Sequence, residues 1–132
     1  QAVLVGIASI ALLVASMGIM NTMLMSVMER THEIGVMKAV GATDAAVLLL
    51  FLLESCVVSL IGGVLGSAIG ALGAKVISVG AGAYFGIEIP AVIKIRIIMG
   101  GIGVALLVGI LSGLYPARKA SKMSPVEAVR YE

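Results

Sequence analysis

The sequence predicts an all-α membrane protein, with three transmembrane helices and one short amphipathic helix between the first and the second. Of its 132 residues, 61% are hydrophobic and 12% are charged, whereas soluble domains are about 45–50% apolar and about 25% charged. Three apolar runs, over about 2–28, 45–76 and 97–116, are each near or above the roughly 20 residues of helix that cross a bilayer. The runs are continuous, while barrel strands are alternating segments of about ten residues, so a β-barrel is disfavoured.

The first run, residues 2–28, is longer than the hydrocarbon core requires, so this helix should tilt or protrude. Asn21 lies near its later end, where an amide is costly against lipid tails unless it hydrogen-bonds another helix or meets water. Two interpretations of Asn21 stay open. The first is a helix–helix or interfacial hydrogen bond, and the second is a place along a substrate pathway.

A charged island, residues 29–41, separates the first two apolar runs. Its apolar residues recur at helical spacing, so a helix would carry one apolar stripe. The stripe is Ile34, Val36, Met37 and Val40, and the polar remainder is Glu29, Arg30, His32, Glu33 and Lys38. Either the membrane interface or a groove on a soluble partner should cover the stripe. Gly41 is expected to end this helix in the left-handed conformation, and Thr43 or Asp44 to cap the next one.

The second run, residues 45–76, is interrupted by Glu54, which lies about 15 Å beyond Asp44 along a helix. A carboxyl at that depth must face protein or water, or be protonated. It could act as a coupling or substrate-pathway acid. The alternative is a carboxyl that is hydrogen-bonded within a helix bundle near the membrane interface.

Small residues at four-residue spacing predict close helix packing in the second and third runs, because packing replaces the hydrophobic driving force in lipid. These residues are Gly62, Gly66 and Gly70 in the second run and Gly109 and Gly113 in the third, which covers residues 97–116. The sequence does not separate packing within the chain from packing between subunits. Residues 75–96, with several glycines and Pro90, are expected to form a loop.

Residues 117–132 are expected to form a basic cytoplasmic tail. The side of the membrane that holds the island and the tail carries Arg30, Lys38, Arg118, Lys119, Lys122 and Arg130, and the other side carries Lys75, Lys94 and Arg96. Basic residues concentrate in cytoplasmic segments of membrane proteins. The island and the C-terminus are therefore expected in the cytoplasm and the N-terminus outside.

Three familiar motifs for catalysis or cofactor binding are absent from the sequence. It lacks the Gly-Lys-Ser/Thr loop that binds nucleotide phosphates, a Cys/His cluster and a Ser-His-Asp set. The net charge of +2, with scattered bases, argues against nucleic-acid binding. We therefore expect no enzymatic activity, no bound cofactor and no metal site, and Cys56 is expected to be an inert thiol.

Five segments of the chain together resemble the C-terminal transmembrane region of MacB/FtsX-type ABC transporter permeases. They are residues 17–23, 28–42, 53–55, 113–120 and 124–131. The order and spacing of these motifs are specific, and the resemblance covers nearly the whole chain. In that family a first membrane helix and an external domain precede three further helices, so this chain is expected to be a fragment that lacks both.

The resemblance also implies partners and an interface. Residues 29–41 are similar to the cytoplasmic coupling helix of the family, which docks on an ATP-binding subunit or domain, so that ATP is bound by the partner ATPase. The implied ATPase-coupling interface is Glu29, Arg30, Glu33, Ile34, Val36, Met37, Lys38 and Val40. Members of the family commonly work as permease dimers in the lipid bilayer, and an external adaptor or substrate protein is a further expected partner.

The function that the resemblance implies is that of a permease subunit. Such a subunit couples cytoplasmic ATP hydrolysis to conformational change outside the membrane, for export or for substrate extraction. The alternative is a division-type membrane signalling or scaffold subunit that activates an external partner such as a cell-wall hydrolase. Substrate identity is not encoded in these residues.

Overall fold

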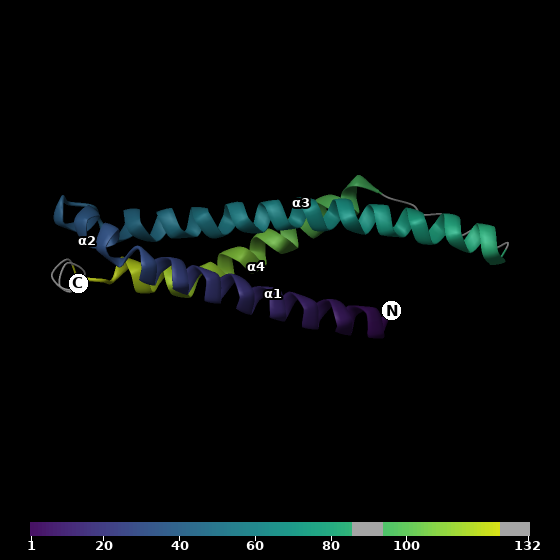
Figure 1. The fold of residues 1–132 in the computed structure, drawn as a ribbon, viewed down its shortest axis with the longest axis horizontal. Coiled ribbons are helices and arrows are strands. Elements are labelled where there is room, and N and C mark those ends of the chain that lie inside the picture. The colour runs from purple at the N-terminus through teal and green to yellow at the C-terminus, as the bar shows by residue number, and fades with distance from the viewer. Residues whose placement is uncertain (86–93, 125–132) are drawn as a thin grey trace. The chain divides into compact units, whose positions relative to one another are not determined.

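The structure is a computed structural model that describes residues 1–85 and 94–124, the side chains of residues 84 and 85 aside. The described residues form four helices and no strand (Figure 1). The helices are α1 (Ala2–Glu29), α2 (Thr31–Ala39), α3 (Asp44–Phe85) and α4 (Ile95–Ser121). Three of them, α1, α3 and α4, are long and apolar enough to cross a membrane. The predicted fold class is confirmed.

Two helices extend beyond the bounds that the sequence predicts. α3 continues past residue 76 to Phe85, because isolated glycines each weaken a helix by only about 1 kcal/mol relative to alanine. α4 continues through Pro116 to Ser121, so the first residues of the predicted tail are helical. Residues 86–93 of the predicted loop lie outside the described residues, as do residues 125–132 of the predicted tail, which include Arg130.

The chain divides into two compact units, Gln1–Val58 with Leu107–Glu132, and Ser59–Leu106. The buried hydrophobic core lies in the first unit and receives side chains from all four helices. Its members are Met23 and Val27 from α1, Ile34 from α2, Val47 and Phe51 from α3, and Ala117 and Ala120 from α4. The core therefore attaches the short helix α2 to one end of each long helix.

The connection between α1 and α2 is the single residue Arg30, whose φ of −102° and ψ of 18° interrupt the helix. The next residue, Thr31, donates its hydroxyl hydrogen to the carbonyl oxygens of Val27 at 3.1 Å and Met28 at 2.8 Å. The last carbonyls of a helix lack partners within it. Thr31 therefore satisfies the end of α1 while it begins α2.

The turn between α2 and α3 has the caps that the sequence predicts. Gly41 has a φ of 107°. Its amide and that of the following residue donate to the carbonyls of Lys38 at 3.0 Å and Met37 at 2.9 Å, which is the Schellman pattern. Thr43 Oγ1 accepts a hydrogen bond from the Ala46 amide at 3.2 Å, so Thr43 is the residue that caps α3.

Small and hydroxyl-bearing residues join the long helices within the first unit. Ser16 on α1 and Ser112 on α4 share a hydrogen bond of 2.6 Å. Gly109 and Gly113 on α4 are buried. A Cβ built on Gly113 would lie 2.6 Å from the Cβ of Ser55 on α3. The backbone of α4 therefore approaches α3 closely at Gly113.

Candidate functional site

The candidate site surrounds α2, where the end of α1, the beginning of α3 and the end of α4 meet in the first unit (Figure 1). The structure divides the apolar stripe that the sequence predicts. Ile34 is 0% exposed in the core, and Met37 packs against that core. Val36 and Val40 are 45% and 85% exposed, and residues four apart lie on one face of a helix. Ile34 is therefore part of the fold, whereas Val36 and Val40 stay as predicted contact residues.

The structure also changes the place that the sequence assigns to Lys38. Its side chain is only 8% exposed, and its Nζ lies 2.7 Å from Asp44 Oδ1 at the start of α3. The same Nζ donates to the main-chain oxygens of Ser121 and Met123, the latter at 2.9 Å. An ammonium group has three N–H donors, so these three acceptors saturate it. Lys38 is thus engaged within the chain, because α4 extends far enough to bring its last carbonyls beside α2.

Arg30 pairs with two carboxylates. Its Nε lies 2.8 Å from Glu33 Oε2, and its Nη1 lies 3.9 Å from Glu54 Oε2. The hydrogen bond that Arg30 donates to Glu33, and then the negative charge of Glu33, raise the pKa of Arg30 above its ordinary value, with a smaller contribution from Glu54. All three side chains are substantially exposed, so these pairs contribute little to stability. Glu54 faces a cation of its own chain, which favours the interpretation of a carboxyl paired within a helix bundle.

A pocket of about 440 Å³ opens beside α2. It is lined by Met28 and Glu29 from the end of α1, Thr31 and His32 from the start of α2, and Lys119 and Met123 from the end of α4 and just beyond it. Glu29, His32 and Lys119 are exposed. An apolar surface with a polar and charged rim is typical of protein–protein interfaces. The sequence prediction placed Lys119 in the tail and missed its position beside α2, because it ended the third helix at Pro116.

The other residues that the sequence predicts for intramembrane polar contacts and helix packing lie outside α2. Asn21 is exposed on α1. Within the described part of the chain, a Cβ built on Gly62, Gly66 or Gly70 meets no atom within 4 Å beyond its sequence neighbours and the backbone of its own helix. Within the second unit, α3 approaches α4 closely at Gly63, the residue after Gly62. A Cβ built on Gly63 would lie 3.0 Å from the Cβ of Ala105.

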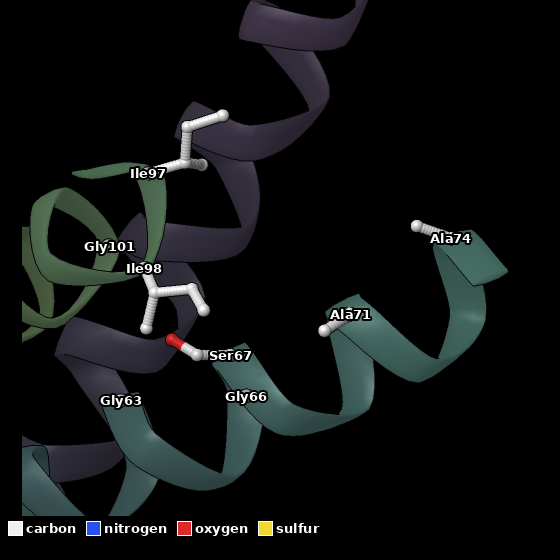
Figure 2. A pocket seen from close by; sticks show the side chains of 9 residues that line it. Gly63, Gly66, Ser67, Ala71, Ala74, Ile97, Ile98 and Gly101 are labelled. Atoms are coloured by element: carbon white, nitrogen blue, oxygen red, sulfur yellow. The ribbon is translucent and has the colours of Figure 1, made fainter. Parts of the chain in front are cut away.

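Gly66 and Gly70 instead line a pocket of about 480 Å³ within the second unit (Figure 2). Figure 2 shows Ser67 of α3 and Ile98 of α4 pointing toward one another, with Ala71 further along α3. The complete lining is Gly63, Gly66, Ser67, Gly70, Ala71, Ala74, Ile97, Ile98 and Gly101. Because its lining holds no ionisable side chain, this pocket offers apolar packing and no acid–base chemistry.

The described residues around α2 therefore provide groups for recognising a protein. Val36 and Val40 are an exposed apolar pair, and Glu33 and His32 flank them with polar groups. Over residues 1–85 and 94–124, no three His, Cys, Asp or Glu side chains are grouped to hold a metal ion. The exposed groups of this arrangement are suited to apolar contact and hydrogen bonding.

Comparison with known proteins relates the sequence to membrane transporters. Residues 5–125 match the family described as FtsX-like permease C-terminal. The chain is 47% identical over 126 residues to the uncharacterized ABC transporter permease YknZ of Bacillus subtilis, which covers 96% of this chain and 30% of YknZ. It is 48% identical over 129 residues to the macrolide export ATP-binding/permease protein MacB of Bdellovibrio bacteriovorus, covering 98% of this chain and 19% of MacB.

A third relative shows the same partial coverage. An uncharacterized ABC transporter permease of Methanocaldococcus jannaschii is 41% identical over 128 residues, which is 97% of this chain and 32% of the relative. The chain thus spans about a third or less of the length of the relatives that it matches. The similarity therefore concerns one part of larger proteins.

Proposed function

Since this chain belongs to the FtsX-like permease family of ABC transporters, we propose that α2 docks on an ATPase and couples ATP hydrolysis to movement of the membrane helices. The observation that carries the proposal is the arrangement of α2 itself. Its inner face contributes Ile34 to a core shared with three long helices, while its outer face presents Val36 and Val40. A helix that contacts a partner with its outer face and the core with its inner face can transmit a displacement of the partner to the long helices.

The energy available from docking supports an interface that is reversible. Burying an aliphatic side chain completely contributes about 1.5–3 kcal/mol, and Val36 and Val40 are two such side chains. Association costs several kcal/mol in lost translational and rotational freedom. The exposed carboxylates of Glu29 and Glu33 and the cation of Lys119 would then add specificity and faster association.

The partner that we propose is an ATPase that holds the ATP, so that the permease itself is a transport component and not an enzyme. The MacB relative is named as an ATP-binding and a permease protein in one, which supports this pairing. The relatives' names do not favour the signalling alternative, and we propose export or substrate extraction. A permease dimer and an external adaptor or substrate protein complete the proposal by analogy with the family.

The orientation that we propose puts α2 in the cytoplasm and the N-terminus outside. Lys38 bonds the carbonyl oxygens of Ser121 and Met123, so α2 and the end of α4 lie at one end of the first unit. The basic residues of the island and of the predicted tail are therefore counted together on one side of the membrane. An excess of basic residues is typical of the cytoplasmic side.

The test is to place a charge on the exposed face of α2. Val36→Asp should abolish the stimulation of ATP hydrolysis that the permease gives its ATPase in proteoliposomes, because a carboxylate cannot be buried in an apolar contact without a partner. Insertion should persist, since Val36 lies outside the buried core. The matched control is Ala45→Asp, an exposed position in the first turn of α3 where an acidic residue is favourable. Equal stimulation by the wild-type and Val36→Asp permeases would refute the docking role of α2.

A further inference from the structure

We propose that Lys38 is the positioning residue that makes α2 and the end of α4 move as one body. The proposal rests on the function proposed above, because it concerns how a displacement of docked α2 reaches a membrane helix. It assigns to Lys38 a role inside the permease in place of the partner contact that the sequence predicted. The role has a geometric basis in the three bonds of its ammonium group.

The first part of the argument is the saturation of Lys38. Its three N–H donors meet Asp44 Oδ1 at 2.7 Å, the Met123 oxygen at 2.9 Å and the oxygen of Ser121. The two main-chain acceptors lie 83 and 85 residues further along the chain. Lys38 therefore joins the last turn of α2 to the end of a helix that is remote in sequence.

The two kinds of acceptor differ in what they contribute. The Asp44 side chain is 70% exposed, so water and salt screen its attraction for Lys38. The bonds to Ser121 and Met123 are partly buried, and they lie at the C-terminal end of α4, where the helix dipole favours a cation. The stronger part of the contact is therefore the one that holds α4.

The second part of the argument is that other polar side-chain contacts of α2 and Arg30 reach α1, α2 itself and α3. Ile34 packs in the core through apolar contacts, which are non-directional. Arg30 pairs with Glu33 on α2 itself and reaches Glu54 of α3 at 3.9 Å. Charge-assisted hydrogen bonds have defined distances and directions. The bonds of Lys38 therefore add defined directions to the contact between α2 and α4, beside the apolar packing of the core.

The experiment measures the separation of α2 and α4 directly in the complete permease with its ATPase. Spin labels at His32→Cys on α2 and Lys119→Cys on α4, in a Cys56→Ser background, report the separation of two residues that line one pocket. With Lys38 present, the separation should stay the same with and without ATP, because the two segments move together. Lys38→Met keeps the aliphatic stem and removes the charge. It should broaden the distribution of separations and, in a protein that keeps His32 and Lys119 and carries no labels, lower the stimulation of the ATPase by about fivefold or more.

The matched control is Asp44→Asn, which removes only the exposed ionic contact. It should retain a narrow distribution and most of the stimulation. A separation that changes with ATP in the protein with Lys38 would overturn the proposal even if Lys38→Met fails to accumulate. A Lys38→Met protein in which the distribution of separations is unchanged, or in which the stimulation is unchanged, would also overturn the proposal.

The two proposals fail in different ways. If Val36→Asp abolishes stimulation and Lys38→Met does not, the role of Lys38 is wrong and docking through α2 stands. If neither substitution changes stimulation, docking itself is wrong and the role of Lys38 falls with it.

Discussion

Replacing Gly113 with alanine should destabilise the first unit, because the new Cβ would lie 2.6 Å from the Cβ of Ser55. Carbon atoms in favourable contact are about 3.5–4.0 Å apart, so α3 and α4 would have to separate by about 1 Å. Rotation of Ser55 cannot relieve this contact, since the Cβ stays where the backbone puts it. Overpacking costs about 1–3 kcal/mol, and the better helix propensity of alanine offsets up to about 1 kcal/mol. The expected loss in the free energy of unfolding is about 1–2 kcal/mol.

The assay is reversible unfolding of the purified protein in mixed micelles, with Ser55 as the second position of a double-mutant cycle. Ser55→Gly removes the opposing Cβ, so the double variant should lose less stability than the sum of the two single changes. Ser55→Ala removes Oγ, which also lies close to the new Cβ, but keeps the Cβ of residue 55, so it should give less relief than Ser55→Gly. A Gly113→Ala protein as stable as the wild type, or strict additivity with Ser55→Gly, would refute the close approach of α3 and α4 at this point.

Two further predictions concern the second unit and the orientation. Gly66→Ala should leave the thermal stability of the monomer intact, because in the described chain a Cβ built on Gly66 meets no atom within 4 Å beyond the backbone of its own helix. A loss in the monomer would show that Gly66 packs within the chain. In a Cys56→Ser background, a cysteine in place of exposed Lys122 should react with an impermeant maleimide only from the cytoplasm, and one in place of Ala83 only from outside. The reverse pattern would contradict the charge count.

The features that the sequence predicts well are those that local patterns specify. Long apolar runs indicate membrane helices whatever they pack against, and the described residues contain three such helices. The cap at Gly41 follows from a conformation that other residues rarely adopt, and Thr43 caps α3 through a bond to a residue three positions away. Each of these signals is contained within a few residues of chain.

Helix ends were harder to predict where competing signals overlap. Pro116 removes one backbone hydrogen bond, and the end of the hydrophobic pattern at the same point favoured a helix end. The helix instead continues, because Ala117 and Ala120 are fully buried in the core beyond the proline. Burial of these two residues depends on neighbours from other helices, and that information is absent from the local sequence.

The same limit explains why a periodic stripe could be recognised but not assigned to a partner. The periodic pattern indicates that one face of α2 is apolar. It does not show whether the core of the chain or the surface of another protein covers that face. The structure uses the stripe for both, with Ile34 inside and Val36 and Val40 outside. Lys38 could not be assigned for a similar reason, since two of its three acceptors are main-chain oxygens more than 80 residues away.

This division of α2 determines how substitutions in it should be interpreted. Removing a buried Ile34 side chain would cost about 2–5 kcal/mol of stability through lost packing alone, before any effect on a partner. A change at exposed Val36 carries no comparable packing loss, so a defect there reports on docking. A change at Lys38 leaves both the core and the outer face in place and removes the bonds to α4. Loss of coupling from these three residues would therefore have three different physical causes, and only measurements of stability, stimulation and helix separation together can distinguish them.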